Sequence, residues 1–237
     1  MVGGGPAGLT AAVALANAGV KTVLVARNSA FSDHRTTALL AGSVTALDTL
    51  GVWQACREHT APLRVMRIID ATARLVRAPE VRFAASEIGL DAFGHNIENR
   101  RLVAALEQGA SEIAALTRIE DEAQTVEIGD REVTVRLSSG RAVVARLAVG
   151  ADGRRSLCRA AAGIETDGRI YPQTALTCNV EHARAHDDTS TEFHTESGPF
   201  TLVPLSGRRS SVDWVVEPAE AARLAALDDR SLAAEIE

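Results

Sequence analysis

A glycine-rich turn at the start of the chain constrains the fold more than any other feature. Four of residues 3–8 are glycine, and an alanine-rich run over residues 9–18 follows, closed by Gly19. That run predicts a helix, and residues 20–25, with four apolar side chains, predict a buried strand. A strand stub, a turn, a helix and a strand form a βαβ unit, so we expect a doubly wound, Rossmann-like α/β domain.

The spacing Gly3-x-Gly5-x-x-Gly8 is typical of dinucleotide binding. Its glycines allow a tight turn, let the backbone approach a pyrophosphate and let the helix pack closely on its strand. Pro6 and Ala7 complete the turn, and the helix N-terminus then faces the anion. A purely structural glycine turn is the alternative, but the surrounding βαβ unit favours a nucleotide.

The acidic residue that normally accompanies this fingerprint, about 20 residues downstream, is missing. Ala26 stands where we expect the acid that accepts from an adenosine ribose, and Arg27 follows it. Arg27 could contact the 2′-phosphate of NADP or lie solvated on a loop, and we favour the solvated arginine.

A second motif follows the apolar residues 143–149. Its spacing, Asp152-Gly153-x-x-Ser156-x-x-Arg159, would arise by chance only about 0.006 times at this composition. At a strand end the Asp152 carboxylate can accept from ribose or ring donors, Gly153 allows close backbone approach, and Ser156 can cap the following helix. An ordinary Asp-Gly turn is the alternative.

Composition and charge exclude several classes of function. The net charge is -6 and Lys21 is the only lysine, so we expect no nucleic-acid partner. Three widely spaced cysteines indicate a reducing compartment, and we expect a cytoplasmic protein with neither a zinc site nor a disulfide framework. His182 and His186 have metal-pair spacing but no third ligand, so we expect no metal. Peripheral membrane contact stays open.

The remaining periodic segments predict a second, β-rich region. Ser43 is expected to cap a short helix, and residues 99–115 are expected to form a longer one. Hairpin arms are expected at 133–137 and 142–150. Further strands are predicted at 64–70, 71–76, 174–180, 192–195, 200–205 and 211–216, and a last helix from Ser231 onward.

Together these residues resemble the FAD-dependent aromatic-ring hydroxylases, and within them the ubiquinone-biosynthesis branch. The resemblance covers nearly the whole chain. Beside the two motifs above, it is carried by residues 33–39, by residues 97–102, and by residues 198–205 with Trp214 after them. The last group indicates the ubiquinone branch.

The resemblance implies a role for each matching residue. Gly3, Gly5 and Gly8 would hold the FAD pyrophosphate, Arg35 would contact the cofactor, and Asn99 would reach it. Asp152 and Gly153 would serve FAD and the passing NAD(P)H. Gly198, Pro199 and Phe200 would line the substrate pocket.

The implied domains are an FAD-binding domain over 1–60 and 97–163 and a smaller, discontinuous β-rich substrate domain over 61–96 and 164–237. The implied reaction is hydroxylation of an electron-rich aromatic ring, such as a prenylated ubiquinone precursor at the inner membrane, with NAD(P)H as reductant and O2 as oxidant. The cofactor supplies this chemistry, so no catalytic side chain is expected.

The ends of the chain depart from the family pattern. Only Met1 and Val2 precede the glycine turn, and no Gly-Asp segment follows the substrate region. We expect a chain truncated at both ends, with a poorly anchored turn and doubtful hydroxylase activity alone. A non-catalytic nucleotide-binding remnant and an NADP-dependent reductase are the alternative hypotheses.

Overall fold

The computed structural model describes residues 1–27 and 33–237. Contacts divide the chain into two compact units. The first unit comprises Met1–Ser32, Ala46–Ala55 and Arg100–Gly168, and the second comprises Asp33–Thr45, Cys56–Asn99 and Arg169–Glu237. Residues 33–45 and 56–60, which we expected in the cofactor domain, group with the second unit because β2 (Thr36–Leu40) and β3 (Thr60–Pro62) both pair with β6 (Gly94–Glu98).

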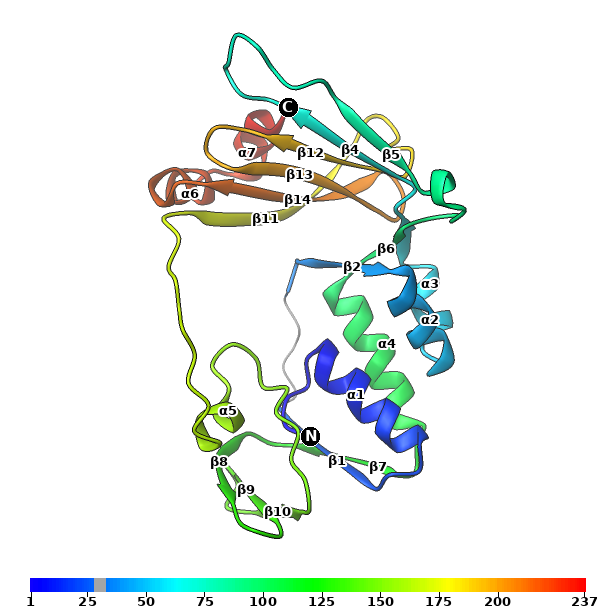
Figure 1. The fold of residues 1–237 in the computed structure, drawn as a ribbon, viewed down its shortest axis with the longest axis vertical. Coiled ribbons are helices and arrows are strands. Elements are labelled where there is room, and N and C mark those ends of the chain that lie inside the picture. The colour runs from blue at the N-terminus through cyan, green and yellow to red at the C-terminus, as the bar shows by residue number, and fades with distance from the viewer. Residues whose placement is uncertain (28–32) are drawn as a thin grey trace. The chain divides into compact units, whose positions relative to one another are not determined.

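A parallel sheet forms the centre of the first unit (Figure 1). β1 (Thr22–Ala26) pairs in parallel with β7 (Leu116–Glu120), and Val2 forms parallel bridges to both Val25 and Gly150. The segments therefore lie across the sheet in the order β7, β1, Val2 and Gly150. Numbered by their place in the chain, this is the order 3-2-1-4 of a doubly wound dinucleotide-binding sheet. The predicted α/β architecture is confirmed.

The two-residue stub before the glycine turn is anchored from both sides. The Val2 N–H donates to Val149 O at 2.9 Å, and Ala151 N–H donates to Val2 O at 2.8 Å. On the other side Val25 N–H donates to Met1 O at 2.9 Å. The expectation of a poorly anchored turn was wrong, because a central position lets even a short segment bond to two neighbouring strands.

α1 (Pro6–Asn17) packs against β1 and β7 of this sheet. It begins with proline, which fits the first helical position, and is followed by the cap residue Ala18 and by Gly19 in a left-handed conformation. α4 (Asn99–Ser111) buries five residues on one face: Leu102, Val103, Ala105, Leu106 and Ala110. α2 (Ala41–Thr49) starts two residues before Ser43, so the prediction that Ser43 caps this helix was wrong.

An antiparallel sheet completes the first unit with β8 (Ala123–Ile128), β9 (Val133–Leu137) and β10 (Ala142–Ala145). The predicted arm 142–150 is a strand only as far as Ala145, and the chain then returns so that Gly150 pairs with Val2. α5 (Leu157–Ala161) follows, and α3 (Trp53–Arg57) lies earlier in the chain.

A six-stranded sheet dominates the second unit (Figure 1). Its order is β11 (Thr174–Glu181), β14 (Arg209–Val216), β13 (Pro199–Leu205), β12 (Thr189–His194), β4 (Val65–Asp70) and β5 (Val81–Ala84). The 3-10 helix η1 (Ala85–Ile88) follows β5, and α6 (Pro218–Ala225) and α7 (Asp229–Ile236) follow β14. Five of the six strands lie where alternation predicted strands, but residues 71–76 form a loop. Asp70 accepts from the N–H groups of Thr72 and Ala78, which turns the chain there.

In the part of the chain that the structure describes, no helix combines the length and the apolar run that crossing a bilayer requires.

Candidate functional site

A cleft of about 600 Å3 opens at the carboxyl ends of the parallel strands of the first unit. In doubly wound sheets ligands bind at this edge, where the strand order reverses, and pockets of this volume are typical of ligand sites. We call it the glycine cleft, and it is lined by Val2, Gly3, Gly4, Gly5, Val25, Ala26, Arg27, Asp121, Glu122, Ala123, Asp152, Arg155 and Leu157.

The three fingerprint glycines have different environments. A Cβ on Gly3, whose φ is +111°, would lie 2.2 Å from the Ala151 carbonyl oxygen, and a Cβ on Gly8 would lie 2.0 Å from the Gly3 carbonyl oxygen. These two positions bring backbone segments together. A Cβ on Gly5 would meet nothing within 4 Å, so this glycine faces open space in the cleft.

The open space at Gly5 lies at the N-terminus of α1. Pro6 and Ala7 form the first helical positions, and no acidic residue occupies the first turn. Unpaired N–H groups and the helix dipole therefore favour an anion at this point, such as a pyrophosphate.

The two sequence motifs meet in this cleft, and Asp152 also organises its wall. One Asp152 carboxylate oxygen accepts from Ser156 Oγ at 2.6 Å, and the other accepts from the N–H groups of Leu157 at 2.6 Å and Cys158 at 3.1 Å. Burial alone would raise the pKa of Asp152, but these hydrogen bonds hold it below its ordinary value. Ser156 caps α5 as predicted, by accepting from Arg159 N–H.

Sequence reasoning missed an acidic residue at the cleft mouth. Ala26 is buried beside Gly4 and has no acidic group, but Glu122, two residues after β7, lines the same cleft. Its carboxylate lies 3.3 Å from the Arg27 guanidinium, and the two side chains are 48% and 71% exposed. The sequence does contain a signal for this carboxylate, the acidic pair Asp121-Glu122 after β7. The pair indicates a cleft residue only once β7 is known to lie beside β1.

The neighbouring carboxylate, Asp121, has a different environment. It accepts from the hydroxyl groups of Ser138 and Ser139 and from the N–H of Glu122. These bonds lower the pKa of Asp121 and tie the end of β7 to the turn after β9. Hydrogen bonds within the protein therefore occupy the Asp121 carboxylate, whereas the Glu122 carboxylate has a single ion pair.

The predicted residues Arg35 and Asn99 lie together in the second unit. Asp33 accepts from Arg35 Nε at 2.8 Å and Nη2 at 2.7 Å, and from Asn99 Nδ2 at 3.1 Å. The hydrogen bonds from Arg35 hold the pKa of Asp33 well below its usual range. Thr37 Oγ1 donates to Asn99 Oδ1 at 2.5 Å, which orients the amide.

Of the predicted pocket residues, Pro199 and Phe200 begin β13 of the six-stranded sheet, and Gly198 immediately precedes it. The Phe200 ring packs edge-on to Trp214 at 5.3 Å and near Phe193 at 5.9 Å, measured between ring centroids. Trp214 packs against the buried cluster that α6 and α7 share with β14, so Phe200 lies on the face that these helices cover.

The opposite face of the same sheet carries polar side chains. Asp213 of β14 stands between Thr177 of β11 and Thr201 of β13 in the register. Burial raises the pKa of Asp213 above its ordinary value.

The histidine pair of the second unit is bonded to the protein. His182 Nε2 lies 2.8 Å from Ser210 Oγ, and His186 Nε2 lies 2.9 Å from the Gly207 carbonyl oxygen. Within residues 1–27 and 33–237, no three His, Cys, Asp or Glu side chains gather as metal ligands would.

Comparison with known proteins gives consistent matches. Residues 1–237 match the family described as FAD binding domain. Ubiquinone hydroxylase UbiL of Rhodospirillum rubrum is 34% identical over 244 residues, covering 100% of this chain and 56% of that protein. The 3-demethoxyubiquinol 3-hydroxylase of Escherichia coli is 31% identical over 248 residues, covering 100% of this chain and 61% of that protein.

Among solved structures, PqsL of P. aeruginosa in complex with 2-aminobenzoylacetate matches with a TM-score of 0.79 at 20% identity, covering 98% of this chain and 68% of that chain. This likeness supports the fold. The chain spans little more than half the length of the curated relatives named above.

Proposed function

The chain belongs to the FAD binding domain family, as its resemblance to flavin-dependent aromatic hydroxylases predicted, and on that premise we propose that the glycine cleft holds the ADP half of FAD. The observation that carries this proposal is the open space at Gly5, at the N-terminus of α1 and at the edge where the strand order reverses. A phosphate there would face the backbone N–H groups of the first helical turn.

The residues of the cleft divide the binding tasks. Gly3 and Gly8 keep the turn tight, Gly5 leaves room for the pyrophosphate, and Arg155 adds a positive charge on the cleft wall. Gly153, in a left-handed conformation, allows the backbone to approach the cofactor. The Asp152 carboxylate is already bonded to the N-terminus of α5, so its contribution to binding is to hold this wall in position.

For the whole protein we propose an FAD-dependent monooxygenase that hydroxylates an aromatic ring, with NAD(P)H as reductant. The relatives named ubiquinone hydroxylase UbiL and 3-demethoxyubiquinol 3-hydroxylase support a ubiquinone precursor, including a prenylated one, as the substrate. Bound FAD would supply the redox chemistry, while the protein binds and orients the substrate and excludes water. Arg35 and Asn99, held together by Asp33, are proposed cofactor contacts.

For the substrate we propose the polar face of the second-unit sheet, where Thr177, Asp213 and Thr201 stand side by side. These groups can hydrogen-bond a ring hydroxyl. Gly198 and Pro199 would border this surface, and Phe200 would support it from the helix-covered face.

Calorimetry with the purified chain tests the cofactor site, using FAD, ADP and FMN as separate ligands. We expect FAD and ADP to bind and FMN to fail, because FMN lacks the adenosine and pyrophosphate that the glycine cleft would hold. Binding of FMN in preference to ADP would contradict the proposal. Failure of all three would favour a non-binding remnant.

The NADP-reductase alternative depends on Arg27. Arg27 is paired with Glu122, whose charge would repel a 2′-phosphate, so this alternative has less support than FAD binding. Comparing ADP with 2′-phospho-ADP-ribose in the same calorimeter distinguishes them, because an NADP site would favour the phosphorylated ligand.

A further inference from the structure

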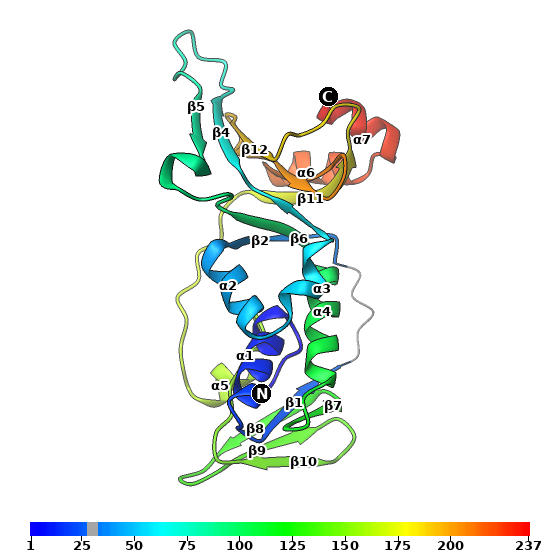
Figure 2. The ribbon, with the colours of Figure 1, turned by 90° about the vertical axis from the view of Figure 1, so that its right-hand side faces the viewer.

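The hairpin of β4 and β5 projects from the edge of the six-stranded sheet in the second unit (Figure 2). Its connecting loop, residues 71–80, presents two aliphatic side chains to solvent. Leu75 is 102% exposed and Val76 is 84% exposed. Neighbouring aliphatic residues that are this exposed are unusual on a protein surface and mark interaction sites.

Arginines bracket this aliphatic tip, and the two acids of the hairpin accept hydrogen bonds from other residues of the same hairpin. Arg74 and Arg77 stand on either side of Leu75 and Val76. Asp70 accepts from Thr72 Oγ1 at 2.7 Å and from Ala78 N–H at 2.9 Å, which closes the base of the loop.

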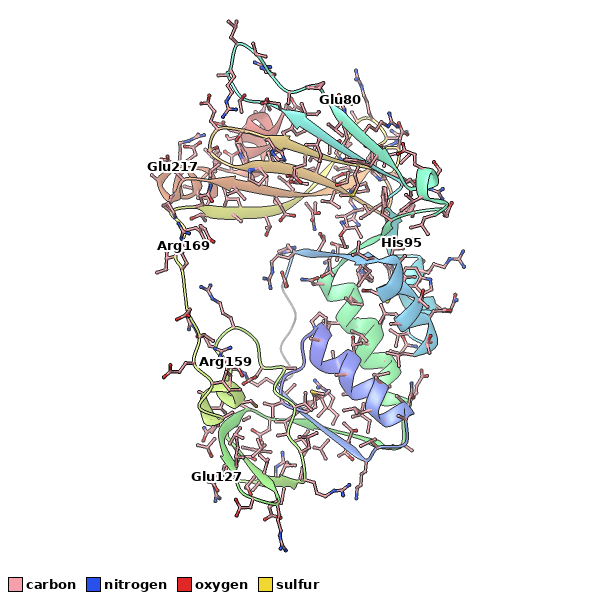
Figure 3. The ribbon with its side chains drawn as sticks, viewed as in Figure 1. Glu80, His95, Glu127, Arg159, Arg169 and Glu217 are labelled. Carbon is pink, nitrogen blue, oxygen red and sulfur yellow. The ribbon has the colours of Figure 1, made fainter. Side chains whose placement is uncertain are left out.

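The second acid of the hairpin is also paired. Figure 3 labels Glu80 where the loop returns toward β5. Its two carboxylate oxygens accept from Nε and Nη2 of Arg67, each at 2.8 Å. Residues 65–84 hold four arginines and two acids, a net charge of 4 − 2 = +2, although the whole chain carries -6. The hairpin is therefore a basic element of an acidic protein.

One face of the hairpin continues the apolar tip. Met66 pairs with Phe83 and Ile68 pairs with Val81, so these four side chains share a face, while Arg67 and Arg82 share the other. Met66, Val81 and Phe83 are between 41% and 46% exposed, and β5 is an edge strand.

We propose that this hairpin docks on an anionic lipid surface, with Leu75 and Val76 entering the boundary between headgroups and acyl chains while Arg74 and Arg77 contact lipid phosphates. A bilayer interface places an apolar layer beside a negatively charged one. The tip complements it, because Leu75 and Val76 are apolar and the flanking Arg74 and Arg77 are positively charged. The contact goes beyond the proposed function and depends only on the hairpin. In a ubiquinone-precursor hydroxylase it would bring the enzyme to a lipid-soluble substrate.

Vesicle sedimentation with the full chain tests the proposal. Vesicles of phosphatidylcholine alone are compared with vesicles that also contain phosphatidylglycerol, at low and high salt. We expect binding only to the anionic vesicles. Arg74→Gln with Arg77→Gln should lower the partition coefficient roughly 30-fold, which corresponds to about 1 kcal/mol for each arginine at an anionic surface. Leu75→Ser with Val76→Ser should lower it at least about tenfold by removing the inserted side chains.

Matched control variants keep the interpretation specific. Leu147→Ser removes a side chain that is 75% exposed in the first unit, and Arg131→Gln with Arg146→Gln removes the same charge as the tip variant. Neither control should change the partition coefficient. An equal loss in the controls would overturn the proposal, because it would assign binding to general charge or hydrophobicity, and so would absence of wild-type binding.

A second measurement separates lipid from a protein partner. In Leu75→Trp, the added tryptophan emission should shift to the blue on anionic vesicles, relative to wild-type chain that has only Trp53 and Trp214. Light scattering of the free chain gives the oligomeric state. If Leu75→Ser with Val76→Ser converts an oligomer to a monomer and the tryptophan shows no shift, the tip joins copies of the chain and the lipid proposal is wrong. ADP binding is measured on every variant, so loss of the cofactor site is recognised separately.

Discussion

The Arg27 guanidinium and the Glu122 carboxylate lie 3.3 Å apart at the mouth of the glycine cleft, one after β1 and the other after β7. Because β1 and β7 are parallel neighbours, the ends of both strands open onto the same cleft. β1 ends in Ala26, which has no acidic group. The neighbouring strand β7 thus brings the carboxylate of Glu122 to this cleft. We expect Glu122 to accept from the adenosine ribose.

Glu122→Gln should therefore raise the ADP dissociation constant about tenfold. This change is near the lower end of the range for losing a hydrogen bond to a charged group, because the Glu122 side chain is half exposed. Calorimetry measures this change. The control Glu112→Gln removes an exposed charge outside the cleft and should have no effect.

The ribose assignment has its own check. With wild-type chain, 2′-deoxy-ADP or 3′-deoxy-ADP should bind more weakly than ADP, and Glu122→Gln should lose that discrimination. Adding Ala26→Glu to the variant should restore it. If Glu122 instead controls discrimination between ADP and IDP, and not between ADP and the deoxy ligands, it contacts the adenine amino group. That result would refute the ribose role.

Gly8→Ala and Gly5→Ala should separate packing from ligand binding. The Gly8 Cβ would approach the Gly3 carbonyl oxygen to 2.0 Å, so we expect a loss of about 2 kcal/mol in the free energy of unfolding. The Gly5 Cβ enters open space, so stability should hold while affinity for ADP falls. Thermal denaturation and calorimetry of both variants measure this contrast, and equal loss of stability in the two would contradict it.

Stability should depend on pH through Asp33. Its pKa is lowered in the folded state by Arg35 and Asn99, so its contribution is complete above the ordinary pKa of 3.8 and is lost as the pH falls through the lower folded value. Asp33→Asn should lower the free energy of unfolding at pH near 7, with the difference from wild type closing in acid. Denaturant titrations across pH test this, and in an Arg35→Gln background the effect should shrink. A difference that stays constant with pH would argue against the ion pair.

Phe200→Ala should act on stability. The ring contacts Trp214 and Phe193 on the helix-covered face, so we expect a loss of about 2 kcal/mol, below the range for a fully buried phenylalanine. Thr201→Val, on the opposite face, should change the unfolding free energy little. The reverse ranking in chemical denaturation would place Phe200 away from the packed core.

The sequence by itself determined the elements whose signals are local. The glycine spacing and the helix after it specified the turn and α1, because a short run of residues contains every group that those structures need. Alternating side chains likewise predicted β11, β12, β13 and β14. Ser156 was identified as a cap for the same reason, since its bonding partner is three residues away.

Only the tertiary structure decided which distant residues meet. Strand pairing placed Glu122 beside Arg27 and set Val2 between Val25 and Gly150, and no short-range pattern encodes such neighbours. The turn of Asp70 toward Ala78 replaced a predicted strand with a loop, because a side-chain hydrogen bond competed with strand pairing. The face on which Phe200 lies followed from its register with Trp214, and register depends on the whole sheet.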